Sequence, residues 1–242
     1  TAHGAPIYRK QEELWGAIVL VRDVTQIRQL EKMRRLFVAN ASHELKTPLT
    51  SVQGYIEAIL DGMVKEDNQR RAYLQRVLNE TNRMSRLIGD ILDLSKLQSG
   101  QIEFDRREFD LVSIINSVLS NLESKLVNGK VKRKLPDKCL VIGDPNRIEE
   151  VLINLVSNAD KFTDDEGEII VTIDQQPTKV WVHVIDDGVG IPSSEQQHIW
   201  ERFHQVDRAR RPDEEGTGLG LAIVKETVEK LGGEVAVESE SE

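Results

Sequence analysis

The amino-acid sequence predicts a helical hairpin that pairs into a dimeric four-helix bundle, followed by an α/β sandwich. Apolar residues recur at helical spacing over two long stretches between residues 26 and 99. After residue 99 the pattern changes to short strands that alternate with helices. We therefore expect the end of a preceding domain at residues 1–25, the hairpin at 26–99 and the sandwich at 100–242.

Composition narrows the possible function classes. The chain has 242 residues, of which 39% are apolar, so it can bury the cores of one or two domains. Its formal net charge of -9 would repel a phosphate backbone, which argues against nucleic-acid binding. The single cysteine, Cys139, lies in an apolar run. Cys139 is therefore expected to be buried. A single cysteine cannot form a disulfide framework, which favours a cytoplasmic protein.

Membrane contact is expected only through segments absent from this chain. The longest unbroken apolar run, residues 17–21, is far shorter than the roughly 20 residues that a membrane helix needs. The sequence has neither an initiating methionine nor a signal peptide. It is therefore expected to be the cytoplasmic part of a longer sensor whose sensing or membrane segments lie upstream.

The N-terminal elements follow from local patterns. Residues 14–21 are aliphatic and β-branched and predict a buried strand. Asp23 or Thr25 can cap the helix that follows, and Gly62 ends it. A second helix begins near Asp67. Each helix has an apolar stripe that a lone hairpin cannot cover, so two copies are expected to pair through residues 27–98.

The C-terminal half predicts a two-layer sandwich. Short strands are expected at residues 130–135, 139–142, 168–175 and 179–185, with the last two paired around a turn at Gln176-Pro177. Asp144 can cap a helix that has Pro145 at its first position and runs to about Phe162.

His43 is the first candidate for chemistry. At about 100° per residue it lies roughly 200° from Ala41 and Leu45, which belong to the apolar stripe, so its imidazole is expected to face solvent. A neutral imidazole is a competent nucleophile, and the adjacent Glu44 could hold or accept the ring proton. Pro48 cannot donate a hydrogen bond to the Glu44 carbonyl, which weakens the helix one turn away. By itself, a surface histidine is more often merely solvated.

The helix after Asp144 carries one polar stripe. Asn154, Asn158 and Lys161 follow one another at i, i+4 and i+7. Amide oxygens suit a hard cation such as Mg²⁺, and a lysine one turn further suits phosphate. A solvated helix face is the alternative interpretation.

Two glycine-rich segments complete the pattern. Residues 186–192 place Asp186 before Gly188 and Gly190, where a backbone can pass close to a flat ligand and a carboxylate can accept a hydrogen bond from an exocyclic amine. Ser193 occupies the position of the third glycine of a dinucleotide-binding motif, which argues against Rossmann-type binding. Residues 216–221 open a helix whose N-terminal amides can receive phosphate, but no P-loop lysine follows.

The segment His43-Glu44-Leu45-Lys46-Thr47-Pro48 resembles the H-box of sensor histidine kinases. The resemblance implies that His43 is the phospho-acceptor and Glu44 a general base. It also implies that Thr47 orients water in the reverse, phosphatase reaction.

Further motifs in the same order resemble the N, G1, F and G2 boxes of that family, so the match spans about residues 40–221. It implies Asn158 as the Mg²⁺ ligand, Asp186 as the reader of the adenine amino group, and an ATP lid of roughly 25 residues from Ile191. Trp200 replaces a usual phenylalanine, and Gln205 replaces an often basic residue for which Arg210 or Arg211 could substitute. The implied nucleotide contacts are Asn154, Asn158, Lys161, Asp186, Gly188, Gly190, Phe203, Gly216, Thr217, Gly218, Leu219 and Gly220.

The resemblance also implies a Bergerat fold, ATP and Mg²⁺ as cofactors, a homodimer, and the receiver domain of a response regulator as partner. Residues 14–25 look like the last strand of a PAS sensor domain and the start of a signalling helix. Because the family adds a strand after residue 238, the sheet edge is expected to be incomplete. Two alternatives remain: a Bergerat-fold ATPase that drives conformational change, and a nucleotide-binding scaffold without catalysis.

Overall fold

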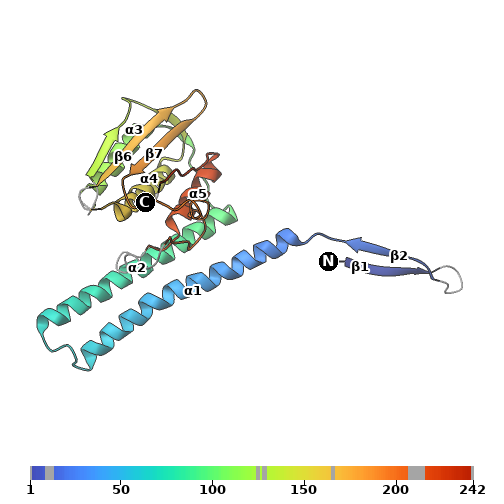
Figure 1. Cartoon of the computed structure of the whole chain (residues 1–242), viewed down its shortest axis with the longest axis horizontal. Coiled ribbons are helices and arrows are strands. Elements are labelled where there is room, and N and C mark those ends of the chain that lie inside the picture. The colour runs from blue at the N-terminus through green and yellow to red at the C-terminus, as the bar shows by residue number, and fades with distance from the viewer. Residues whose placement is uncertain are drawn as a thin grey trace. The chain divides into compact units, whose positions relative to one another are not determined.

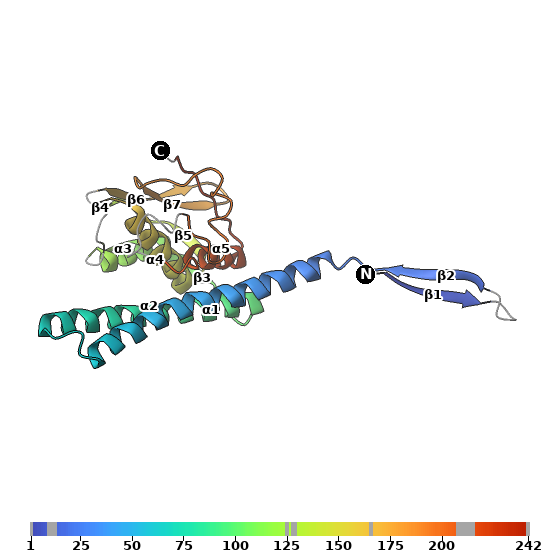
Figure 2. The ribbon, with the colours of Figure 1, turned by 60° about the horizontal axis from the view of Figure 1, so that its bottom comes forward.

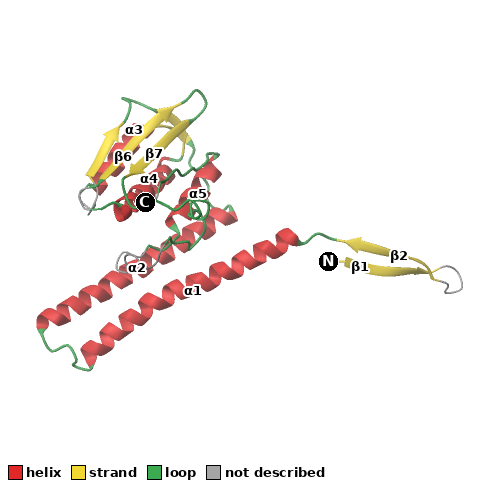
Figure 3. Cartoon of the chain, viewed as in Figure 1, coloured by secondary structure: helices red, strands yellow, loops and turns green. Residues whose placement is uncertain are grey.

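A computed structural model describes residues 2–8, 14–123, 126, 130–164, 167–206 and 216–240. The chain divides into two compact units, Thr1–Thr47 and Pro48–Glu242, each of which is described by itself. Figure 1 shows the helices and strands along the chain, most of them labelled, and Figure 3 colours them by type.

The first unit begins with a hairpin of two antiparallel strands. Strand β1 (Ala2–Tyr8) pairs with β2 (Leu14–Val21). The sequence predicted β2 but not β1. The Asp23 carboxylate then accepts a hydrogen bond from the backbone N–H of Thr25 at 2.8 Å, which is one of the two caps expected at the start of the next helix.

Two long helices form the predicted hairpin. Helix α1 (Thr25–Leu60) and helix α2 (Asp67–Ser99) are joined by residues 61–66, in which Gly62 adopts a φ of 71°. In the second unit, the rings of Tyr55 and Tyr73 meet edge to face at 5.4 Å and join the end of α1 to the start of α2. No helix within the described ranges is both long and apolar enough to span a bilayer.

The α/β sandwich follows α2. Its strands are β3 (Arg107–Asp110), β4 (Lys130–Lys134), β5 (Leu140–Gly143), β6 (Glu168–Gln175) and β7 (Val180–Asp186). Its helices are α3 (Leu111–Leu122), α4 (Pro145–Phe162) and α5 (Gly220–Leu231). The main sheet has the order β4-β6-β7, with β4 parallel and β7 antiparallel to β6, while β3 pairs with β5. Figure 2 shows α3 and α4 on one face of this sheet.

Helix α3 supplies most of the domain core. Its six buried apolar residues pack with Leu152 and Val156 of α4, Val171 of β6 and the buried Cys139. Neither β3 nor α3 was predicted from the sequence. The Asp110 carboxylate fixes both, because it caps α3 through the N–H of Val112 and also accepts from the N–H of Cys139.

Helix α4 has the predicted cap and the predicted end. The Asp144 carboxylate accepts hydrogen bonds from the backbone N–H groups of Asn146 and Arg147, and its second oxygen accepts one from that of Asp105 at 3.0 Å. Because Asp144 is buried, these bonds take the place of water around its charge. The start of the helix is thereby fixed to the segment that leads into the domain.

The last described segment, residues 233–240, forms no strand. It is nevertheless held in place, because the Ser239 hydroxyl accepts from the backbone N–H of Ile191 at 2.9 Å and the Ser239 carbonyl accepts from the Gln196 amide at 2.8 Å. Among the described residues the main sheet has three strands.

Candidate active site

His43 lies on α1 with its imidazole exposed to solvent, as the helical spacing predicted. Its side chain is 71% exposed, whereas that of the neighbouring Glu44 is only 12% exposed. The Nδ1 atom of His43 lies 4.0 Å from a carboxylate oxygen of Glu44. This orientation turns one ring nitrogen towards a carboxylate and leaves Nε2 directed away from it.

One turn later the backbone is altered by Thr47 and Pro48. The Thr47 hydroxyl donates a hydrogen bond to the His43 carbonyl at 3.3 Å, as threonine commonly does within helices. Pro48 lies inside α1 and has no N–H to donate to the Glu44 carbonyl. Directly after His43 the helix therefore has an added side-chain bond to the His43 carbonyl and lacks a backbone bond to the Glu44 carbonyl.

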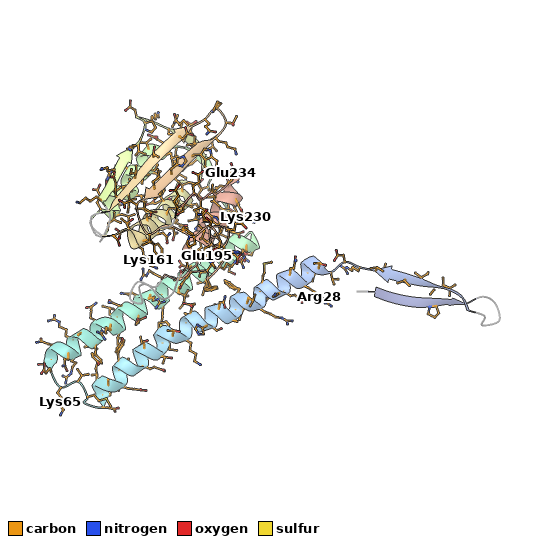
Figure 4. The ribbon with its side chains drawn as sticks, viewed as in Figure 1. Arg28, Lys65, Lys161, Glu195, Lys230 and Glu234 are labelled. Atoms are coloured by element: carbon orange, nitrogen blue, oxygen red, sulfur yellow. The ribbon has the colours of Figure 1, made fainter. Side chains whose placement is uncertain are left out.

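In the second unit, the polar stripe of α4 meets the glycine segment that begins α5. A side chain added at Gly220 would place its Cβ 3.0 Å from the Asn154 amide oxygen, and one at Gly216 would place it 3.1 Å from the Lys161 ammonium. The Asn154 amide nitrogen donates to the Glu150 carbonyl, so its oxygen faces the start of α5. Lys161 is labelled at the end of α4 in Figure 4. Two residues from each predicted motif are thus brought together.

Asn158 occupies the same face of α4, half-buried between Asn154 and Lys161. Its amide makes no hydrogen bond to another described residue. Lys161 and the N-terminus of α5 both favour phosphate. An amide oxygen beside them is suited to bind a Mg²⁺ ion that also binds the phosphate oxygens.

The first glycine segment packs against the end of α4. A Cβ on Gly188 would lie 2.3 Å from the Phe162 carbonyl oxygen, so only glycine fits there. The Asp186 carboxylate accepts from the N–H of Gly188 at 3.1 Å, and the side chain remains exposed. Its neighbour Asp187 accepts from the N–H of Glu168 at 2.8 Å, a structural role that was not predicted. Gly190 adopts a φ of 69° further along.

The predicted F-box residue Phe203 packs against the second glycine segment. It has a φ of 60°, which is unusual for a residue with a side chain, and its N–H donates to the Gly218 carbonyl at 2.8 Å. The Gln205 amide donates to the Gly216 carbonyl at 2.6 Å. The Gln205 side chain therefore binds the backbone of Gly216. At this position a basic residue was expected to contact phosphate. Its suggested substitutes, Arg210 and Arg211, lie outside the described residues.

Two histidine–glutamate pairs hold the turns before Phe203. His204 Nε2 lies 2.9 Å from a carboxylate oxygen of Glu195, and His198 Nδ1 lies 2.8 Å from one of Glu201. The hydrogen bond to Glu201 raises the pKa of the exposed His198. Neither histidine was predicted to have a function, and both pairs act on local structure.

Sequence reasoning missed one contact between α2 and the glycine segment. The Thr217 hydroxyl donates a hydrogen bond to the Asp90 carboxylate at 3.0 Å and accepts one from the N–H of Leu219 at 3.2 Å. Burial raises the pKa of Asp90, while the bond from Thr217 acts against that shift. The available signal was an acidic residue inside the apolar stripe formed by Leu87 and Leu94.

Comparisons with known proteins agree with this arrangement. The family described as "His Kinase A (phospho-acceptor) domain" matches residues 33–100. The family described as "Histidine kinase-, DNA gyrase B-, and HSP90-like ATPase" matches residues 143–242. The sensor histidine kinase WalK of Bacillus subtilis (strain 168) is 37% identical over 237 residues, which are 96% of this chain and 39% of WalK.

Two solved structures of histidine kinases match most of the chain. The histidine kinase AdeS of Acinetobacter baumannii matches with a TM-score of 0.69 and 27% identity, over 82% of this chain and 92% of that one. The histidine kinase ThkA, solved in complex with the response regulator TrrA, matches with a TM-score of 0.65 and 27% identity, over 96% of this chain and 68% of that one.

The chain spans about two fifths of the length of WalK from Bacillus subtilis and from Staphylococcus haemolyticus (strain JCSC1435). Within that span it contains both a phospho-acceptor helix with an exposed histidine and an ATPase domain whose polar helix face meets a glycine segment. With both family matches and the identity to WalK, these features show that the chain belongs to the sensor histidine kinases.

Proposed function

We propose that this chain is an ATP-dependent protein-histidine kinase that phosphorylates His43 and passes the phosphoryl group to an aspartate of a response regulator. The observation that carries the proposal is the exposed His43 imidazole beside the Glu44 carboxylate, within the phospho-acceptor domain. The likeness to ThkA, which was solved with a response regulator, supports the choice of partner.

The first step follows from the orientation of the ring. With the ring proton on Nδ1, which faces Glu44, the Nε2 lone pair is available to attack the γ-phosphorus of ATP. The bond between Nε2 and phosphorus forms as the bond from phosphorus to the bridging oxygen of ADP breaks. Glu44 holds or accepts the Nδ1 proton, which offsets the positive charge that develops on the imidazole. In the second step an aspartate oxygen attacks phosphorus, and the phosphorus–nitrogen bond breaks to restore the imidazole.

The ATPase domain binds and orients the donor. Lys161 and the N-terminal amides of α5 favour the triphosphate, and the Asp186 carboxylate accepts a hydrogen bond from the adenine amino group. Asn158, with Asn154 beside it, would hold Mg²⁺. When bound, the metal neutralises charge that develops on the phosphates during transfer.

The chain acts as a homodimer and at a cytoplasmic location, attached to a membrane only through segments outside it. The buried free Cys139 supports the cytoplasmic location.

A Bergerat-fold ATPase or a scaffold without catalysis would need neither the exposed His43 nor the phospho-acceptor domain around it. The proposal therefore accounts for both halves of the chain.

Replacing the nucleophile separates chemistry from binding. In His43→Gln, the acid-labile, base-stable label from [γ-³²P]ATP should be lost, while Mg²⁺-ATP binding measured by calorimetry should be unchanged, because the imidazole is a nucleophile and not a ligand. His183→Gln, which alters another exposed histidine, is the matched control and should label normally. Full labelling of His43→Gln would rule out this acceptor.

Replacing the proposed metal ligand should affect binding and labelling together. Asn158→Ala is expected to lower Mg²⁺-ATP affinity roughly 10- to 100-fold, in the range seen for changes around metal sites, and to lower labelling in parallel. Ser157→Ala changes the adjacent exposed residue and should affect neither. If titrations with and without Mg²⁺ give the same affinities for Asn158→Ala as for the original chain, Asn158 belongs to a solvated helix face.

The phosphatase role proposed for Thr47 has a test that separates it from the observed backbone bond. Thr47→Ala should leave His43 labelling largely intact but slow the decay of a phosphorylated receiver domain in the presence of ADP, because the hydroxyl orients the attacking water. Thr47→Ser keeps a hydroxyl and should restore the decay. Equal decay rates with all three proteins would mean that the hydroxyl serves only the His43 carbonyl.

The dimer prediction rests on an exposed stripe of α2. Leu74, Leu78, Ile88 and Leu92 share one face of the helix and are all exposed, a pattern that favours a partner helix. Light scattering should give twice the 27.4 kDa mass of one chain, and Leu78→Glu should shift it towards one. Asn79→Glu adds the same charge away from the stripe and should remain dimeric. A folded monomer of the original chain at micromolar concentration would contradict the bundle.

A further inference from the structure

The opposite face of α2 carries a carboxylate within a buried apolar stripe. Leu87, Leu94 and Leu97 are 3%, 1% and 2% exposed. At about 100° per residue, Asp90 falls with them inside a sector of about 80°. Helix α2 packs against α5 of the ATPase domain. A charged group in such a stripe costs stability unless it has a partner, so the position of Asp90 calls for one.

The partner of Asp90 belongs to the nucleotide loop. The Asp90 carboxylate accepts a hydrogen bond from the Thr217 hydroxyl at 3.0 Å. The same hydroxyl oxygen accepts from the N–H of Leu219, which is fully buried directly before α5. Thr217 is thus fixed from two sides, once by its own loop and once by α2. Its only hydroxyl proton is committed to Asp90.

Thr217 also lies between the two positions that face α4. Gly216, on one side, approaches the Lys161 ammonium, and Gly220, on the other, approaches the Asn154 amide oxygen. In the proposed function these groups receive the triphosphate. A carboxylate bonded to Thr217 brings negative charge to the loop that must accept several more negative charges, and like charges at close range oppose each other.

We infer that Asp90 is a positioning residue for the nucleotide loop, which it holds through Thr217 in a docked arrangement that disfavours ATP. The inference rests on the proposed ATP-binding function of this loop. ATP binding and the bond between Asp90 and Thr217 then oppose each other, and by linkage each weakens the other by the same factor. Helix α2, which follows the phospho-acceptor helix in the chain, thereby acts directly on nucleotide affinity.

Two other contacts hold α5 without involving this loop. The Gln98 amide reaches Glu226 of α5 at 3.5 Å, and the Arg106 guanidinium donates to the Lys230 carbonyl at 2.9 Å. The first contact joins the end of α2 to α5, and the second joins the segment between α2 and β3 to α5, so docking has support independent of Asp90. Removing the Asp90 charge should therefore change nucleotide affinity without undoing the fold.

The test measures Mg²⁺-ADP binding to the full chain by calorimetry and the ATP dependence of His43 labelling. Asp90→Ala removes the charge and the acceptor, and it should raise nucleotide affinity at least about fivefold, within the usual range of coupling between sites. The apparent KM for ATP should fall by a similar factor, with a smaller change in the rate at saturation. Asp90→Asn removes the charge but keeps an acceptor oxygen, so a smaller gain is expected.

Two further variants assign the effect to the pair. Asp93→Asn changes the same charge one turn along α2, without a bond to Thr217, and should leave affinity near that of the original chain. In a Thr217→Val background, Asp90→Ala should give a clearly smaller gain, because the two residues act through one bond. A merely structural role for Asp90 would lower affinity or leave it unchanged.

The outcomes distinguish this inference from the function on which it rests. If the original chain labels His43 but Asp90→Ala and Asp90→Asn bind Mg²⁺-ADP no more tightly than it does, the inference is overturned and the kinase proposal stands. An equal gain from Asp93→Asn would also overturn it, since the effect would then be one of general charge. A chain that binds no nucleotide would overturn both.

Discussion

The nucleotide site depends on the packing of one helix, α4, which has an apolar face towards the core and a polar face towards α5. Its apolar face, with Leu152 and Val156, joins the core formed by α3 and the sheet. Its polar face carries Asn154 and Lys161 against the start of α5. Because the buried Asp144 fixes the beginning of this helix, the core and the proposed phosphate-binding groups are positioned by the same element.

Glycine allows the surrounding loops to come close enough to that face. At Gly188 and Gly218 a Cβ atom would overlap backbone atoms of Phe162 and Phe203, respectively. These close approaches explain in physical terms why glycine-rich segments, rather than merely flexible ones, border the site. In this packing Phe203 adopts a left-handed backbone conformation, which is strained. The hydrogen bond from its N–H to the Gly218 carbonyl helps to offset that strain.

The sequence predicted those parts that depend on local patterns. The cap at Asp144, the helix that ends at Phe162 and the outward direction of His43 all follow from residues within a few positions of each other. Helix α3 was missed although it is strongly apolar on one side, because no motif drew attention to it. Strand β1 was missed because it contains Gly4 and Pro6, two residue types that are disfavoured in strands.

The contacts that the sequence did not reveal join distant positions. Thr217 meets Asp90 across 127 residues, and Gln205 binds the Gly216 carbonyl across a segment of the proposed lid. Hydrogen bonds of this kind leave no periodic pattern in the sequence. The one sequence feature that pointed to such a contact was Asp90, an acidic residue within an apolar stripe. The polar contacts between the helical part and the ATPase domain therefore had to come from the structure.

In the proposed function, the two halves of the chain act together to move a phosphoryl group from ATP to His43. The most direct measurement is to incubate the unmodified chain with [γ-³²P]ATP and Mg²⁺ and to map the protein-bound label by peptide analysis under alkaline conditions. We expect an acid-labile, base-stable phosphate on the peptide that contains His43. ATP hydrolysis without protein-bound phosphate, or label on a different residue, would contradict it.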